Sequence, residues 1–225
     1  MGHELIKDIK YFFGCFLDLI YNPEECMVCG EYVKNGGLLC AKCSSEIRIC
    51  NKFFKITRQN YSIPCYSSFY YSGLGKELIA RLKYRSDFRA GDVITEYMLN
   101  TIKIHKVNFD IVTYVPCSKS ALKKRGYNQS QYLAKKIAHK TNSRVVEFLK
   151  KFKDTKDQIG LNGEERWKNL EGAFEVTNEN KINNKNILLV DDVITTGATA
   201  FYCSTLMIEK GASNVYILTG AKSSI

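Results

Sequence analysis

The chain has 225 residues, of which 45% are hydrophobic, and a formal net charge of +10 at pH 7. That length allows one full domain and a smaller module, and the apolar fraction is ordinary for a globular protein with a buried core. The positive charge is concentrated between residues 51 and 160, where it attracts a polyphosphate or a nucleic acid, or forms only a solvated lysine-rich surface.

The longest apolar stretch near the N-terminus covers residues 9–20. It is too short to cross a bilayer, and charged residues interrupt or flank it. No small-residue cleavage site of a signal peptide follows it. We expect an amphipathic helix that packs on the protein's own core, with a membrane-surface helix as the alternative. The sequence therefore predicts a cytoplasmic protein without stable membrane insertion.

Two C-x-x-C pairs occur among the nine cysteines, Cys26 with Cys29 and Cys40 with Cys43. An odd number of cysteines in a chain without a secretory signal argues against a disulfide framework. Four thiolates at this spacing favour a closed, tetrahedral and structural Zn²⁺ site. We therefore predict a small four-cysteine zinc module in residues 1–50, where the metal replaces a core that so short a segment cannot build.

Beyond a polar and basic connector at residues 51–64, strand and helix patterns alternate along the rest of the chain. Strands are expected at residues 65–72, 110–115, 144–149, 186–190 and 213–219, and helices at 75–85, 88–104, 128–140 and 197–210. Such alternation builds a parallel sheet with helices packed against it. We expect one α/β domain over residues 65–225, in which the polar segment 150–163 is a long mobile loop.

Two adjacent carboxylates, Asp191 and Asp192, follow the apolar strand at residues 186–190. A loop of small and hydroxyl-bearing residues comes next and opens a helix: Thr195, Thr196, Gly197, Ala198 and Thr199. A helix N-terminus presents unpaired N–H groups and a positive dipole end to a phosphate. The carboxylates can accept hydrogen bonds from ribose hydroxyls and can help to hold Mg²⁺. This order predicts a site for a ribose with a 5′-phosphate at the carboxyl edge of the sheet.

Residues 188–199 resemble the phosphoribosyl pyrophosphate signature of type I phosphoribosyltransferases, and further motifs narrow the resemblance to the ComF family of competence-associated proteins. The motifs occur in the family's order along essentially the whole chain: Tyr71-Ser72-Gly73, Leu82-Lys83-Tyr84, Val115-Pro116-Cys117-Ser118, Arg125-Gly126-Tyr127-Asn128-Gln129, Gln158-x-x-Leu161, Arg166-x-x-Asn169 and Gly172-Ala173-Phe174. One departure is Tyr114, where the family often has a proline. The resemblance implies a type I phosphoribosyltransferase-like parallel sheet with helices on both faces, behind an N-terminal zinc module.

The resemblance also implies roles for individual residues. Ser118 and Lys119 stand either in a loop that contacts the diphosphate or in an ordinary strand-to-helix turn, and the segment 150–163 lies where a flexible lid closes. Arg125 and Asn128 either bind the substrate or only fix the loop, and Arg166 can reach a diphosphate with two hydrogen bonds. The implied catalytic residues are Asp191, Asp192, Arg125 and Arg166.

Two functions of different classes remain. In the first, the protein is a phosphoribosyltransferase that binds phosphoribosyl pyrophosphate with Mg²⁺ and displaces pyrophosphate from the ribose C1 carbon. In the second, it is a non-catalytic competence factor that binds single-stranded DNA during natural transformation, with a helicase as partner. Tyrosines such as Tyr66, Tyr70, Tyr71 and Tyr84 fit a stacking groove, and they fit the core equally well. The three histidines lie outside the motifs, so no residue identifies the acceptor.

Overall fold

The computed structural model describes residues 24–33, 37–50, 53–152, 167, 170 and 172–223. The chain divides into two compact units, Met1–Glu46 and Ile47–Ile225. Three expectations fall outside the described residues: the N-terminal helix at 9–20, most of the polar loop at 150–163, and Arg166. Within the described ranges, no helix is long and apolar enough to cross a membrane.

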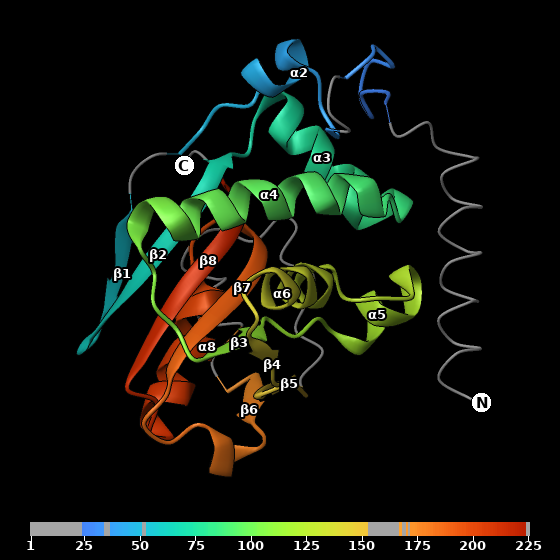
Figure 1. Ribbon diagram of the computed structural model, residues 1–225. Helices are drawn as coiled ribbons and strands as arrows, with labels where there is room; N and C mark the ends of the chain where they lie inside the picture. Colours follow the sequence, from blue (N-terminus) through green and yellow to red (C-terminus); the bar gives the residue numbers. More distant parts are fainter. Residues whose placement is uncertain are drawn as a thin grey trace, which may run out of the picture. The chain divides into compact units, whose positions relative to one another are not determined.

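The second unit is built on a six-stranded sheet with the order β1-β2-β8-β7-β3-β4 (Figure 1). Its strands are β1 (Phe54–Arg58), β2 (Tyr61–Tyr70), β3 (Ile111–Tyr114), β4 (Arg144–Val145), β7 (Asn186–Ile194) and β8 (Asn214–Lys222). β1 runs antiparallel to β2 at one edge, and the other neighbouring pairs are parallel. Parallel neighbours need crossover connections, which the helices between them supply.

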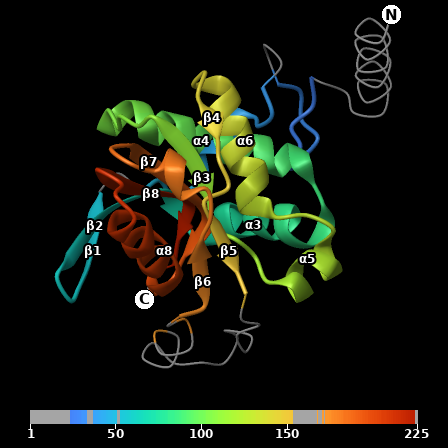
Figure 2. The same cartoon turned by 90° about the horizontal axis from the view of Figure 1, so that it is seen from below.

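Helices cover both faces of this sheet, as Figures 1 and 2 show together. One face carries α3 (Gly73–Arg85), α4 (Phe88–His105) and α6 (Gln129–Lys140), and the other carries α8 (Ala198–Glu209). The central strand β7 is apolar from Ile187 to Val190 because both of its faces are covered, and these four side chains have no exposed surface. The expected fold class, a mainly parallel α/β sheet with helices on both faces, is confirmed.

The start of α6 is fixed to the end of β3 by one side chain. Asn128 caps the helix, because its Oδ1 accepts hydrogen bonds from the backbone N–H groups of Ser130 and Gln131. The Nδ2 of Asn128 also donates to the carbonyl oxygen of Val115, at 3.0 Å. This double contact holds the first turn of α6 at the carboxyl edge of the sheet, beside the end of β7.

The expected connector at residues 51–64 is corrected by the structure. β1 and the first residues of β2 occupy this range and form a hairpin, with a turn in which Gln59 has a φ of 52°. In β1 exposed and half-buried residues alternate, because this edge strand packs on one face only. In β1 the polar residues Lys55 and Thr57 alternate with apolar Phe54 and Ile56, which is the pattern of a strand. The composition of residues 51–64 as a whole is nevertheless that of a linker. The larger unit starts at Ile47.

The expected strand at residues 144–149 is also different. Its first part is the short strand β4, and Leu149 begins β5 (Leu149–Lys151). β5 pairs antiparallel with β6 (Phe174–Val176) in a separate two-stranded sheet. Phe148 and Phe174 belong to the core cluster that also contains Phe201 of α8, so this small sheet packs on the α8 side. After Val145 the chain leaves the main sheet, and Val146, Phe148 and Leu149 join this core cluster.

Candidate functional site

The four cysteines of the first unit lie together. Their sulfur atoms are all within 4.8 Å of one another, and the Sγ atoms of Cys29 and Cys40 are 3.6 Å apart. Zn–S bonds of about 2.3 Å in a tetrahedron place sulfur atoms roughly 3.8 Å apart, so the cluster fits a zinc ion with four thiolate ligands. Gly30 turns the chain behind the first pair with a φ of +77°, and Cys40 caps the short helix α2 (Ala41–Ser45) through Sγ.

A cavity of about 290 Å³ opens in the second unit at the carboxyl edge of β7 and β3. The residues around it come from α3, the loop after β3, α5 (Lys119–Arg125), the start of α6, β5, the end of β7 and the start of α8. They are Lys83, Tyr84, Val115, Pro116, Cys117, Ser118, Arg125, Asn128, Gln129, Ser130, Lys151 and every residue from Asp191 to Ala200. Parallel sheets bind ligands at this edge, and the cavity therefore lies where the fold predicts a ligand site.

The acid pair, Asp191 and Asp192, lies within β7 and not after it. β7 continues to Ile194 along β8, with Asp191 opposite Thr219, whereas β3 ends opposite Val190. The two acidic residues are thus carried by a strand that has only β8 as a neighbour at this point, because β3 does not extend alongside them. Consecutive strand residues point to opposite faces, so Asp192 shares the face of Val190, and Asp191 shares the face of Leu189.

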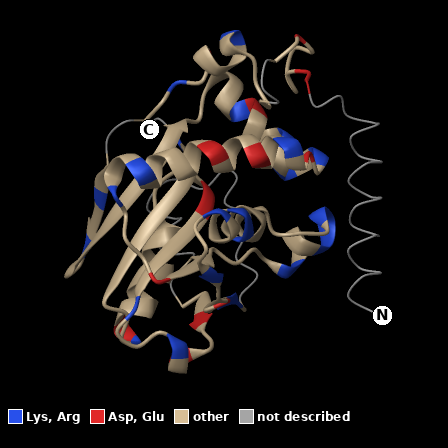
Figure 3. Cartoon of the chain, in the orientation of Figure 1, with Lys and Arg blue, Asp and Glu red and all other residues tan. Residues whose placement is uncertain are grey.

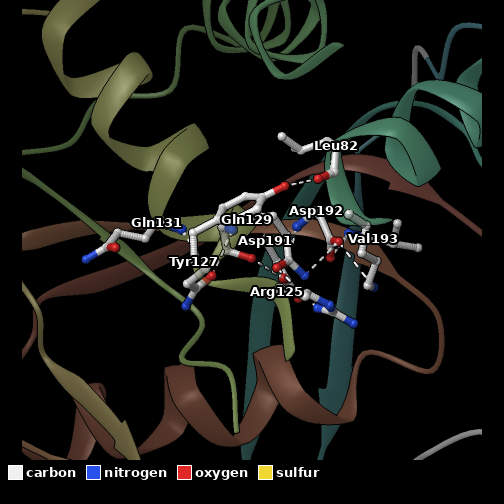
Figure 4. Close-up of polar contacts among 11 residues, drawn as sticks. Leu82, Arg125, Tyr127, Gln129, Gln131, Asp191, Asp192 and Val193 are labelled. Atoms are coloured by element: carbon white, nitrogen blue, oxygen red, sulfur yellow. Dashed lines mark hydrogen bonds and ion pairs between the residues drawn. The ribbon is translucent and has the colours of Figure 1, made fainter. Parts of the chain in front are cut away.

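Each carboxylate accepts hydrogen bonds from the protein (Figure 4). Asp191 Oδ1 accepts from the Ser130 hydroxyl at 2.8 Å and from the backbone N–H of Asp192 at 2.9 Å. Asp192 Oδ2 lies 3.2 Å from Lys83 Nζ and accepts from Gln129 Nε2 at 3.2 Å. Asp192 Oδ1 accepts from the backbone N–H of Val193 at 2.8 Å. Buried carboxylates need such partners because water is largely excluded.

Burial, together with the neighbouring charge of Asp192, raises the pKa of the Asp191 carboxyl to about 7. The Ser130 hydroxyl, the backbone N–H of Asp192 and the Lys83 ammonium act against this rise. The carboxylate of Asp192 raises the pKa of Lys83, which stays protonated. The acid pair therefore carries a charge that the protein compensates only in part.

The loop at residues 195–199 leads from β7 into the N-terminus of α8. Gly197 has a φ of +81°, which is unfavourable for any side chain, and a Cβ atom there would lie 2.8 Å from Ile56 Cδ1. The Thr196 hydroxyl accepts a hydrogen bond from the Ala198 N–H at 3.4 Å. The first turn of a helix has N–H groups without intrahelical partners, and here they border the cavity.

The structure brings together most of the residues that the sequence singled out. Asp191, Asp192, Ser118, Arg125 and residues 195–199 all line the cavity. Lys119 does not: it is exposed at the first position of α5 and is absent from the lining. Ser118 caps the same helix by accepting from the Ala121 N–H.

Sequence reasoning missed four polar residues of the cavity: Lys83, Gln129, Ser130 and Lys151. A signal was present for two of them, because Lys83 lies in the Leu82-Lys83-Tyr84 motif and Gln129 ends the Arg125–Gln129 motif. Ser130 directly follows that motif but belongs to no recognisable pattern of its own. Lys83, Gln129 and Ser130 come from helices that are distant from β7 in sequence, so only the fold reveals their contact with the acid pair.

Comparison with known proteins finds a matching family model and similar curated proteins. Residues 16–56 match the family model of the double zinc ribbon domain. The chain is 26% identical over 157 residues to competence protein ComFC of Bacillus subtilis, a match that covers 69% of this chain and 60% of that protein. It is 29% identical over 109 residues to DNA utilization protein YhgH of Escherichia coli O6:H1, covering 48% and 47% of the two chains. The chain thus spans about half to three fifths of the length of these relatives.

Among solved structures, the chain is similar to adenine phosphoribosyltransferase from Thermoanaerobacter pseudethanolicus. The sequence identity is 10% and the TM-score 0.42, and the match covers 81% of this chain and 98% of that one. A TM-score of this size adds no weight to the fold, which rests on the sheet order and helix layers described above. The resemblance of the sequence to the ComF family is confirmed by the curated relatives and by the zinc ribbon match.

The cluster of four cysteines generates a prediction about metal content. We expect the purified protein to hold one zinc ion per chain, and the Cys40→Ser variant to lose it, because a hydroxyl is a poor zinc ligand. Zinc is measured by mass spectrometry after dialysis, with Cys50→Ser as the control because its thiol lies outside the cluster. A Cys40→Ser protein that retains a full equivalent of zinc would contradict the assignment.

The raised pKa of Asp191 predicts that this residue costs stability at neutral and higher pH. The folded protein keeps the proton where the unfolded chain has lost it, so the free energy of unfolding falls as the pH rises from 3.8 towards 7. We expect Asp191→Asn to raise the free energy of unfolding by about 1–2 kcal/mol at pH 8 and by much less at pH 4. Thermal unfolding at both pH values checks this, with the exposed Glu96→Gln as control. Destabilisation at pH 8 would show that Asp191 is structural.

Proposed function

From this homology with the ComF competence proteins, we propose that the second unit binds phosphoribosyl pyrophosphate in the cavity at the end of β7. One observation carries the proposal: two adjacent carboxylates and the N-terminus of α8 border the same cavity. A ribose 5-phosphate needs this combination, because its hydroxyls donate to carboxylates and its phosphate accepts from free N–H groups. A smaller pocket beside α4, lined by Ile49, Tyr97 and His105 among others, has neither feature.

The parts of the ligand are distributed by chemistry. The 5′-phosphate takes the backbone N–H groups and hydroxyls of residues 195–199, where Gly197 lets the chain approach closely. The ribose hydroxyls donate to Asp191. The diphosphate takes the positive side of the cavity, which Arg125 and Lys151 provide with the Ser118 hydroxyl. Arg166 joins this group in the proposal on the strength of its motif alone.

Mg²⁺ enters the proposal with the ligand. Both oxygens of Asp192 are engaged by Lys83, Gln129 and the Val193 N–H, so the acid pair offers a cation at most the Oδ2 of Asp191. We therefore propose that the ion is bound mainly by the diphosphate itself. Its chemistry is to neutralise charge on the leaving group.

We further propose that the ligand is the donor in a phosphoribosyl transfer. The bond from ribose C1 to the diphosphate oxygen breaks, its electrons leave with the pyrophosphate, and an acceptor forms the new bond to C1. The chain contributes by holding the ribose in place and neutralising the diphosphate. No histidine lines the described cavity, so the proton of the acceptor is not assigned to an imidazole.

Calorimetric titration with phosphoribosyl pyrophosphate and Mg²⁺ tests this function. We expect micromolar binding to the wild type and a loss of at least about tenfold in Gly197→Ala, which strains the loop, and in Asp191→Ala. Affinity rises with pH between about 6 and 8, because only the deprotonated Asp191 accepts both ribose hydroxyls. The Glu96→Gln protein serves as control. Folded, zinc-loaded wild type that binds nothing would rule the function out.

A second candidate function, the binding of single-stranded DNA, is favoured by one surface beside the cavity. Tyr84 is 66% exposed and Phe88 is 44% exposed, and Arg125 lies over the Tyr84 ring at 5.5 Å. Exposed Lys123 and Lys124 lie on α5, where Figure 3 shows a group of basic residues. Exposed rings among cations suit base stacking and phosphate contacts. Tyr66 and Tyr70 are less suitable, since both are partly buried in β2.

This candidate predicts DNA binding that weakens steeply with salt. Fluorescence anisotropy with a labelled oligothymidine should show the logarithm of the affinity falling linearly with the logarithm of salt concentration. Lys123→Ala with Lys124→Ala should reduce both the affinity and this slope, and Tyr84→Ala should reduce the affinity alone. Lys103→Ala with Lys106→Ala, at the other end of α4, is the charge-matched control. A salt-independent or absent signal would remove this function.

A further inference from the structure

The two members of the acid pair have different surroundings. Asp192 is 4% exposed, and each of its oxygens already has a partner in the protein. Asp191 is half-buried, and its Oδ1 takes both of its hydrogen bonds, from Ser130 and from the Asp192 N–H. Within the described part of the chain, Asp191 Oδ2 accepts no hydrogen bond, and Asp191 lines the cavity. Only one carboxylate of the pair is therefore available to a ligand without breaking existing contacts.

Lys83 supplies the positive charge among the partners of Asp192. It lies in the last turn of α3, and its Nζ is 3.2 Å from Asp192 Oδ2. The preceding residue, Leu82, has no exposed surface, and its carbonyl oxygen accepts a hydrogen bond from the Tyr127 hydroxyl (Figure 4). The turn that carries Lys83 is thus anchored through a buried side chain and through its backbone. An ammonium held this way is in place before any ligand arrives.

A chain of polar contacts continues from Asp192 to the rim of the cavity. Gln129 donates to Asp192 through Nε2 and accepts from Arg125 Nη1 through Oε1, at 3.2 Å in both cases. Arg125 in turn lies over the ring of Tyr84. The charged side chains in the described lining are Lys83, Arg125 and Lys151 against Asp191 and Asp192. Lys83 is paired with Asp192, and Arg125 and Lys151 are the other cations that border the cavity.

We propose that Lys83 is a positioning residue, the resident counterion of Asp192, and that it divides the acid pair into a carboxylate held by the protein and a carboxylate, Asp191, that meets the ligand. This inference rests on the proposed function and assigns the roles within that same site. Lys83 acts on the ligand through Asp192, because its ammonium is engaged in an ion pair inside the cavity wall. Without Lys83, the like charges on these two adjacent residues would repel each other without a counterion, so Asp191 would hold its proton more tightly and accept less readily from a ligand.

A lysine that positions Asp192 and a lysine that touches the diphosphate have different effects in a double variant. A lysine that acts through Asp192 loses its effect once Asp192 has lost its charge, whereas a lysine that contacts the ligand keeps it. A double-mutant cycle measures this difference directly. The variants are Lys83→Met, Asp192→Asn and the two combined, with Lys83→Arg as the conservative replacement and Lys76→Met, an exposed lysine of the same helix, as the matched control.

The measurement is calorimetric titration of each protein with phosphoribosyl pyrophosphate and Mg²⁺. We expect Lys83→Met and Asp192→Asn each to weaken binding about tenfold, and the double variant to bind no more weakly than either single variant. Lys83→Arg recovers most of the loss, and Lys76→Met binds as the wild type does. Losses that multiply in the double variant would overturn the proposal and make Lys83 a direct ligand contact.

Thermal unfolding of the same five variants separates this proposal from the proposed function. If the change in melting temperature of the double variant differs from the sum of the changes in the two single variants, the Lys83–Asp192 pair is supported. This holds even if the wild type binds no phosphoribosyl pyrophosphate, a result that would remove only the proposed function. Melting temperatures that are simply additive overturn the pair itself. Circular dichroism of Lys83→Met confirms that a loss of affinity is not a loss of fold.

Discussion

The site depends on a mismatch in strand length, because β7 continues beyond the end of β3. Where β3 stops opposite Val190, β7 goes on to Ile194 with support from β8 alone. The open side of β7 becomes a cavity wall, and the acid pair stands in that wall on a rigid strand. Rigid placement matters because side chains that are already in position need not be ordered when a ligand binds, which lowers the free-energy cost of binding. The helices then supply the partners that make buried carboxylates tolerable.

Those partners come from parts of the chain far from the acid pair in sequence. Ser130 and Gln129 stand on the first turn of α6, which Asn128 fixes to β3, and Lys83 stands on α3. The compensation is incomplete, since the pKa of Asp191 is still raised. A carboxylate that is only partly compensated gains hydrogen bonds when a hydroxyl-bearing ligand arrives. The predicted cost in stability and the proposed binding thus have one cause, the placement of Asp191.

Much of this arrangement could be predicted from the sequence, and the failures have physical causes. The continuous apolar run from Ile187 to Val190 indicates a strand covered on both faces, and Gln129–Lys140 has a helical period, so both types were predicted correctly. The hairpin of β1 and β2 was missed because an edge strand with Lys55 and Thr57 has a linker's composition. Lys119 was expected at the cavity through its place beside Ser118, yet the helix cap at Ser118 leaves Lys119 in solvent. The contact between Lys83 and Asp192 has no local signal at all.

We propose that the end of β7 and the start of α8 form one site for a phosphorylated ribose. The most direct test is an amide NMR titration of the ¹⁵N-labelled protein with ribose 5-phosphate, which is free of the diphosphate and of Mg²⁺. We expect shifts for the backbone amides of Asp191, Asp192 and residues 195–200, and none of comparable size on α4. Shifts confined to the basic surface of α5, or no shifts in a folded protein, would contradict it.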